Sequence, residues 1–209
     1  SKTYFVIWTT TTWTLPANDA ICVGPNFTYS LVKWEDEYYV MAEALYESAM
    51  KAAGKTGYQV VGTIQGKDLE YNEEPPILYR PDLSGDRRDH VTLESGTGCV
   101  HTAPGHGVDD FNVCQNYPDI PVIVPVDSLG RMTEEAGEKF AGLTTSQANA
   151  AIAEHLKETG AVRHGKIIHQ YPHCWRCGTP LIYYAKPSWY IEMTKLRDQL
   201  VENNNTVNW

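Results

Sequence analysis

Residues 96–111 have the sequence GTGCVHTAPGHGVDDF, and they hold the densest cluster of titratable groups in the chain. Two imidazoles, His101 and His106, and two carboxylates, Asp109 and Asp110, fall within ten residues of each other. The glycines around them permit a close approach between the backbone and a ligand, because glycine has no Cβ. The stretch therefore predicts a ligand-binding or catalytic loop.

Other chemistries could use the same residues. A zinc enzyme would use His101, His106 and Asp110, but their spacing matches no established metal signature. Cys99 and His101 lie two residues apart on an expected strand and so share a face, which could bring a thiol nucleophile to a base. A buried core cysteine is the favoured interpretation of Cys99. The stretch contains no GxxxxGK[ST] pattern and is therefore not a P-loop.

Hydrophobic periodicity and turn residues divide the rest of the chain into strands and helices. Strands are expected over residues 3–10, 20–23, 29–34, 58–64, 96–101, 122–126 and 162–170. Helices are expected over 38–53, 109–116, 146–159 and 193–202, and the proline-rich segment 73–88 reads as a surface excursion. Strands scattered among a few helices indicate an α+β fold with a strand-rich, barrel-like core and peripheral helices.

A second unusual stretch, WTTTTWTLPAN, covers residues 8–18. Its hydroxyl groups can both donate and accept hydrogen bonds, which suits an ester, a ribose or a water molecule. Composition alone favours a simpler interpretation, a strand that exposes its threonines, because threonine is a good strand former.

A third stretch, YPHCWRCG at residues 171–178, contains a CxxC pair, Cys174 and Cys177. The pair is half of a zinc knuckle, and a second CxxC is absent from the sequence. His164, His169 or His173 could in principle complete the site, although a reduced pair without metal is favoured for this chain. A thioredoxin-type redox role is weaker, because no βαβ pattern surrounds the pair.

Composition limits the class of protein. The 209 residues carry a net charge of −9, so no basic face for a long nucleic acid is evident. The five cysteines are an odd number and form no disulfide framework, which favours a reducing, cytoplasmic location. No run of about 18 apolar residues is present, so no membrane partner is expected.

Together, the three stretches resemble the editing insertion of isoleucyl-tRNA synthetases, which are class I aminoacyl-tRNA synthetases. The family patterns are WTTTPWTLPAN, GTGxVHTAPGHGxDD and a closing segment similar to YPHCWRCGTPLIY. The resemblance covers nearly the whole chain and implies the editing-domain fold shared with valyl and leucyl relatives. These relatives usually have an arginine after the threonines and lack the HTAPGHG sequence. The synthetic signatures HIGH and KMSKS are absent, so editing without amino-acid activation is implied.

The resemblance also implies roles for individual residues. Asp110 matches the aspartate that holds the α-ammonium group of the substrate, and Thr9 to Thr11 match threonines that contact the substrate and the terminal adenosine. Substrate-binding residues would be Trp8, Thr9, Thr10, Thr11, Trp13, His101, Asp110 and Tyr171. Those expected to serve catalysis are Asp110, Thr10, Thr11 and His101. The chain departs from the family at Thr12, where proline is usual, and threonine is expected to loosen the loop and add a donor.

The implied function is hydrolysis of valine from mischarged tRNA(Ile) by an editing domain spanning residues 1–209. Residues 171–209 would be a segment returning to the absent catalytic domain. The implied partners are the 3′ end of valine-charged tRNA(Ile) and the rest of the synthetase, and we expect a monomer. Hydrolysis needs no cofactor, whereas Cys174 and Cys177 could bind zinc in the full-length enzyme. Two alternatives are a non-catalytic RNA-binding module with a zinc knuckle and a free-standing hydrolase that edits in trans.

Overall fold

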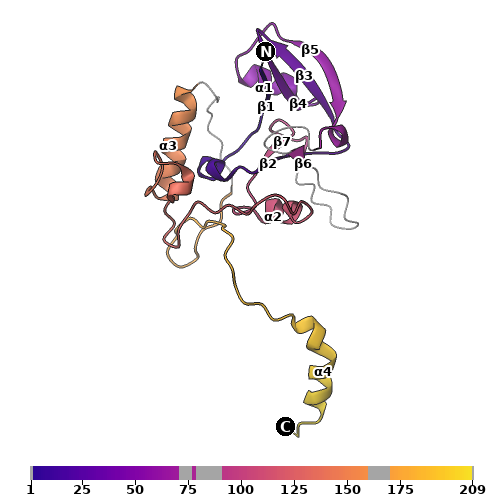
Figure 1. Cartoon of the computed structure of the whole chain (residues 1–209), viewed down its shortest axis with the longest axis vertical. Coiled ribbons are helices and arrows are strands. Elements are labelled where there is room, and N and C mark those ends of the chain that lie inside the picture. The colour runs from indigo at the N-terminus through magenta and orange to yellow at the C-terminus, as the bar shows by residue number, and fades with distance from the viewer. Residues whose placement is uncertain (1, 71–76, 79–90, 160–169, 209) are drawn as a thin grey trace.

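The computed structural model describes residues 2–70, 77–78, 91–159 and 170–208 (Figure 1). Its strands are β1 (Lys2–Phe5), β2 (Ala20–Val23), β3 (Thr28–Trp34), β4 (Glu37–Ala42), β5 (Gln59–Gln65), β6 (Ile77–Leu78) and β7 (Cys99–Thr102). The α-helices are α1 (Tyr46–Ala52), α2 (Val108–Cys114), α3 (Thr145–Glu158) and α4 (Met193–Asn205). Three short 3-10 helices are η1 (Thr12–Ala17), η2 (Gly66–Asp68) and η3 (Glu134–Ala136).

The described strands form two sheets. The larger sheet has the order β1-β4-β3-β5, in which β3 pairs antiparallel with both neighbours and β1 runs parallel to β4. The smaller sheet has the order β6-β2-β7. The α+β expectation is confirmed, but the described strands do not close, so the barrel-like core is not.

The smaller sheet brings the two most distinctive stretches of the sequence together. β2 follows η1 directly and pairs antiparallel with β7, so that Ala20 lies opposite Thr102 and Ile21 lies opposite His101. The end of the 8–18 stretch is therefore held beside the start of the HTAPGHG loop. This pairing creates the geometry of the site.

One apolar core connects the two sheets. Val23 of β2, Tyr29 of β3, Ala42 of β4 and Cys99 of β7 are buried in it together. The hydroxyl of Tyr29 donates to the carbonyl oxygen of Gly98 at 2.7 Å, which fixes the entry to β7. A second core, which contains Trp13 of η1 and Ala148 and Ile152 of α3, joins these two helices.

Gly98 is required at this entry. Its φ is 76°, and a Cβ there would lie 2.4 Å from the Cβ of Ala42. A larger residue would therefore be strained by its backbone and by the packing of the sheet.

The helix expected over 38–53 is wrong in its first half. Residues 37–42 form β4, and only Tyr46–Ala52 is helical. Val40 packs into the core between the sheets, while Met41 packs on the opposite face with Val32 and Met50. Since both faces of β4 are buried, apolar and polar residues do not alternate along its sequence. The apolar residue four positions after Met41 then resembles the spacing of a helix.

Two other strand expectations fail. Residues 122–126 form no strand in the structure, and only Val126 makes an isolated bridge, with Met132. Val122 is half exposed, so the apolar run is not a buried ladder. The strand expected over 3–10 ends at Phe5, and the threonines follow it in a loop rather than on a sheet.

The remaining elements agree to within a few residues. The strands expected over 20–23, 29–34 and 58–64 and the helices over 109–116, 146–159 and 193–202 are confirmed. The strand expected over 162–170 and most of the excursion over 73–88 lie outside the described residues. Within the described residues, no helix is both long and apolar enough to cross a membrane.

Candidate functional site

Four segments enclose a cavity of about 410 Å³ between the smaller sheet and η1. These are the threonine loop, β7 with the segment before it, the first turn of α2, and a segment near residue 171. The cavity is lined by Trp8, Thr9, Thr10, Thr11, Trp13, Thr14, Thr92, Ser95, Gly96, Thr97, Gly98, Cys99, Val100, His101, Ala103, His106, Asp110, Tyr171, Pro172 and Tyr183. All eight residues predicted to bind substrate are among them.

The threonine loop is shaped by its own hydroxyl groups. The Oγ1 of Thr9 accepts the backbone N–H of Thr11 at 3.0 Å, and the hydroxyl of Thr14 lies 2.8 Å from the carbonyl oxygen of Thr11. Thr10 is exposed and lines the cavity beside them. The loop therefore presents hydroxyl groups and backbone to the cavity in a fixed turn.

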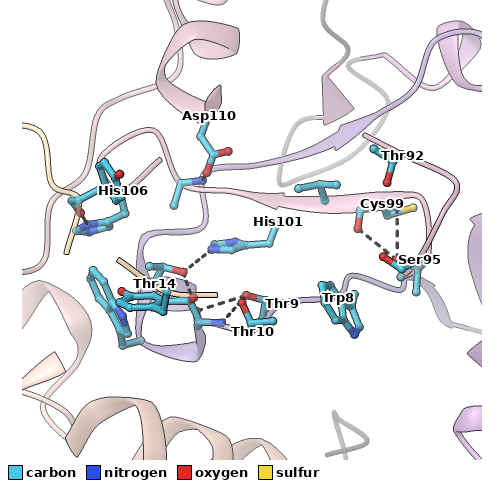
Figure 2. Close-up of a pocket in the computed structure, with 18 of the residues that line it drawn as sticks. Trp8, Thr9, Thr10, Thr14, Thr92, Ser95, Cys99, His101, His106 and Asp110 are labelled. Carbon is cyan, nitrogen blue, oxygen red and sulfur yellow. Dashed lines mark hydrogen bonds between the residues drawn. The ribbon is translucent and has the colours of Figure 1, made fainter. Parts of the chain in front are cut away.

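His101 links the threonine loop to β7 (Figure 2). Its Nε2 lies 3.0 Å from the hydroxyl of Thr14, and its Nδ1 contacts Oδ1 of Asn18. With Oδ1 facing it, Nδ1 carries the proton, so Nε2 is an acceptor. The single hydrogen of the Thr14 hydroxyl can go to this nitrogen or to the carbonyl oxygen of Thr11, one at a time.

Burial decides the charge of this ring. His101 is only 8% exposed. Burial lowers its pKa to about 4, against the opposing attraction of the Asp110 carboxylate, with the nearby His106 adding to the lowering. His101 is therefore a neutral hydrogen-bonding group at neutral pH.

Asp110 enters the cavity from the first turn of α2, and Figure 2 shows it and the threonines on opposite sides of the His101 ring. Its Oδ2 accepts the backbone N–H of Ala103 at 3.0 Å. A Cβ on Gly107 would lie 2.7 Å from the same carboxylate, so glycine is needed there for Asp110 to fold back. The N–H of Ala103 thus orients the carboxylate, and the missing Cβ of Gly107 leaves room for it.

The glycines of the HTAPGHG loop approach protein atoms rather than leaving space for a ligand. A Cβ on Gly105 would lie 2.1 Å from the carbonyl oxygen of Ile123. The expectation that the backbone approaches a ligand is wrong for Gly105 and Gly107, which do not line the cavity in the described structure. Gly96, next to Trp8, and Gly98 do line it.

The segment after residue 170 covers one side of the cavity. The carbonyl oxygen of Tyr183 lies 3.0 Å from Nδ1 of His106. The N–H of Ala185 donates to the carbonyl oxygen of Gly105 at 2.7 Å. Burial lowers the pKa of His106, which keeps this ring neutral too. Beyond residue 185 the chain leaves the cavity, and α4 stands apart with every described residue exposed (Figure 1).

The structure disfavours two alternative chemistries. Burial raises the pKa of the Cys99 thiol to about 12, so hardly any thiolate is present to act as a nucleophile, and Cys99 belongs to the core. Within the described residues no group of three or more His, Cys, Asp or Glu could hold a metal ion. A zinc enzyme built on His101, His106 and Asp110 is therefore contradicted.

Cys174 and Cys177 lie in a tight turn and are not among the described residues that line the cavity. The N–H of Gly178 donates to the carbonyl oxygen of Cys174 at 2.9 Å, which closes the turn. Hydrogen bonds from Thr179 and from the Cys174 side chain lower the pKa of the Cys177 thiol to about 7. A cysteine pair in such a turn suits zinc, but it supplies only two of the four ligands that a structural site needs.

Sequence reasoning missed several residues of the site. Asn18 and Thr14 lie in the 8–18 stretch, where the sequence indicates no role for them, and they fix the His101 ring. Asn149 is an asparagine among alanines in α3, and it contacts the threonine loop from 137 residues away. The stretch near residue 95 also lines the cavity, through Ser95 and Thr92.

Known proteins resemble the chain in sequence along its whole length. The isoleucine–tRNA ligase of Petrotoga mobilis is 46% identical over 213 residues, and that of Caldicellulosiruptor bescii is 49% identical over 210 residues. Each match covers 100% of the chain and 22–23% of the ligase. The chain thus spans under a quarter of these relatives' length. No protein-family model matches it.

Solved structures resemble it in fold. The CP1 domain of GlLeuRS has a TM-score of 0.57 at 14% identity, covering 79% of this chain and 85% of that domain. The cytosolic leucyl-tRNA synthetase editing domain of P. falciparum has a TM-score of 0.55 at 10% identity, and the match covers 75% of this chain and 77% of that chain.

These results define the class first: the chain has the fold of the editing domains found in class I aminoacyl-tRNA synthetases. Within that class, it is homologous along its whole length to one segment of the isoleucine–tRNA ligases. The resemblance drawn from the three sequence stretches is confirmed.

Proposed function

We propose that the chain performs post-transfer editing, the hydrolysis of valine from mischarged tRNA(Ile). The observation that carries the proposal is the cavity itself, which is lined by the carboxylate of Asp110 and by a turn of threonine hydroxyls on the other side of His101. Aromatic side chains, including Trp13, form part of the wall. Such a site offers one anchor for a cation and several hydrogen-bonding groups around an apolar pocket.

Each part of the cavity suits one part of an aminoacyl ester. The carboxylate of Asp110 would hold the α-ammonium group through a charge-assisted hydrogen bond. The threonine loop would contact the ester and the terminal ribose, and the neutral ring of His101 would shape the pocket. The net charge of −9 suits a short single-stranded RNA end, read by stacking and edge contacts, better than a duplex.

The reaction needs only water. The oxygen of a water molecule attacks the carbonyl carbon of the ester, the bond to the ribose oxygen breaks, and that oxygen takes up a proton. The products are free valine and uncharged tRNA. Because the ester is already activated, a positioned water and a clamped ammonium are sufficient, and no covalent nucleophile is required.

The choice of valine follows from a limit on binding. One methylene in a hydrophobic pocket is worth only about 1–3 kcal/mol, and isoleucine against valine is the standard example of this limit. A second, smaller pocket that hydrolyses what fits raises the accuracy. A valine-sized editing pocket would serve this purpose.

The cysteine pair belongs to the same proposal. Cys174 and Cys177 would supply two zinc ligands, and the other two would come from elsewhere in a full-length synthetase. The segment 171–209 would connect the editing domain to the remainder of that enzyme. Zinc would hold this connection in place and would take no part in hydrolysis.

Two aspartates allow a matched test of the clamp. Asp110→Asn should lower the release of valine from tRNA(Ile) by about 100-fold or more, because a neutral amide binds an ammonium weakly. Asp109→Asn is the control, since Asp109 is adjacent, exposed and does not line the cavity in the described structure. It should retain activity within about twofold. Equal activity of the two variants would reject the clamp.

A further inference from the structure

The 3-10 helix that carries the cavity wall begins without a side-chain cap of its own. η1 starts at Thr12, and the side chain of its N-cap residue, Thr11, makes no capping hydrogen bond. The first N–H groups of any helix have no partner inside the helix and need an acceptor. In η1 the acceptor comes from a different part of the chain.

Asn149, in the middle of α3, supplies that acceptor. Its Oδ1 accepts the N–H of Thr12 at 2.8 Å and the N–H of Trp13 at 3.3 Å. The hydroxyl oxygen of Thr12 lies 2.7 Å from both the backbone oxygen and Oδ1 of Asn149, and it can donate to one at a time. Asparagine oxygen is among the best acceptors for a helix start, and here it acts across 137 residues.

This contact lies directly behind the cavity. Among the described residues, Thr11 and Trp13 line the cavity, whereas Thr12 between them does not. Thr12 therefore faces α3 while its neighbours face the cavity. A shift of Thr12 would move both neighbours together.

The helix behind the contact is well fixed. α3 begins with a capping box, in which Thr144 and Gln147 satisfy each other's backbone N–H groups. Ala148 and Ile152 of α3 pack against Trp13 in the second core. The loosening expected from a threonine at position 12 is thus opposed by a hydrogen-bonded support.

We propose that Thr12 and Asn149 form an anchor that positions the threonine loop for hydrolysis. Both are positioning residues, since they act through Thr11 and Trp13. The proposal rests on the proposed editing function for its kinetic consequence, but the anchor itself is a property of the fold. Proline suits the first position of a helix because it needs no acceptor there, so proline at position 12 would remove most of the need for Asn149.

That relationship gives a direct test in the 209-residue chain. The variants are Asn149→Ala, Asn149→Asp, Thr12→Pro and the double variant Thr12→Pro/Asn149→Ala, with Glu154→Ala on the exposed side of α3 as the control. Release of valine from tRNA(Ile) gives kcat and KM, and thermal unfolding gives Tm.

We expect Asn149→Ala to lower kcat on the order of tenfold with KM changed less than about twofold, because a misplaced loop slows reaction more than binding. Asn149→Asp keeps the acceptor and should stay within about twofold of the unmodified chain. In the Thr12→Pro protein, Asn149→Ala should change kcat by less than about twofold. The anchor would be overturned if Asn149→Ala lowered kcat equally in the Thr12 and Thr12→Pro proteins. It would also be overturned if Asn149→Asp were as slow as Asn149→Ala.

The unfolding data separate this proposal from the editing function. If the unmodified chain releases no valine, the editing proposal fails and Tm alone decides the anchor. Asn149→Ala should then lower Tm by roughly 2–4 °C with Thr12 present and hardly at all in the Thr12→Pro protein. Equal shifts in the two backgrounds would reject the anchor independently of any activity.

Discussion

His101 has both a chemical and a structural role in the cavity. The ring is held between Thr14 and Asn18, and both nitrogens have partners. Since burial keeps it neutral, it contributes hydrogen bonds and shape rather than charge. Among the described residues that line the cavity, Asp110 is the one carboxylate, and it is accompanied by neutral donors and acceptors.

The low pKa of His101 predicts a loss of stability in acid. Between pH 6.5 and about 4 the unfolded chain binds a proton at this residue and the folded chain does not, so the free energy of unfolding falls as the pH falls. The effect reaches at most about 3 kcal/mol. Urea unfolding at pH 7, 5.5 and 4.5 should show a shallower decline for His101→Gln than for the unmodified chain. Parallel declines would contradict the assignment.

Among the elements, α2 has the most direct effect on the site. The helix begins immediately after Gly107, and its first turn carries Asp110 back toward the N–H of Ala103. The position of the carboxylate thus depends on a small residue at the start of α2. A change there displaces Asp110 without replacing any group that would meet the substrate.

Gly107→Ala should separate activity from stability. Gly107 has φ −136°, which alanine adopts without strain, so the damage comes from the new Cβ against the Asp110 carboxylate. We expect about 1–3 kcal/mol of destabilisation and a loss of hydrolysis on the order of tenfold or more. Gly62→Ala in β5 is the control, because its Cβ would meet no atom within 4 Å. If Gly107→Ala hydrolyses as fast as this control, the placement of Asp110 is not critical.

The elements also show how far sequence reasoning reaches. α3 and β2 were predicted because one has amphipathic spacing and the other is a short apolar run between turns. β4 was missed because its two faces pack into different cores, which removes the alternation that identifies a strand. Hydrophobic periodicity identifies an element that buries one face, and it does not identify a strand that buries both.

Site residues that lie within a recognisable sequence motif could be predicted. Asp110 and the threonines came from motifs, and they do meet in one cavity. Asn149 could not be predicted, because its role depends on α3 packing against η1. The same holds for Thr14 and Asn18, whose partner His101 lies on a strand that only the fold brings near.

At the scale of the whole molecule, the cavity forms where the smaller sheet, η1, α2 and the segment near Tyr171 meet. No single element provides the site, which explains why the motifs are spread from residue 8 to residue 183. The CxxC turn lies on the same segment as Tyr171, but its two cysteines are not among the described lining residues.

This arrangement predicts that hydrolysis does not depend on metal. Treatment with EDTA should leave the rate of valine release within about twofold, and so should the double substitution Cys174→Ser/Cys177→Ser. The reason is that two cysteines cannot complete a tetrahedral zinc site, and the proposed reaction uses only water. A rate that collapses on chelation and returns with added zinc would contradict this prediction.

The proposed function requires that this cavity select valine on tRNA(Ile) for hydrolysis. The most direct measurement compares release of the amino acid from Val-tRNA(Ile) and Ile-tRNA(Ile) by the same preparation at high protein concentration. We predict release of valine at least about tenfold faster than release of isoleucine, because the pocket must exclude one methylene. Equal rates, or no release from either substrate by a folded chain, would contradict the claim.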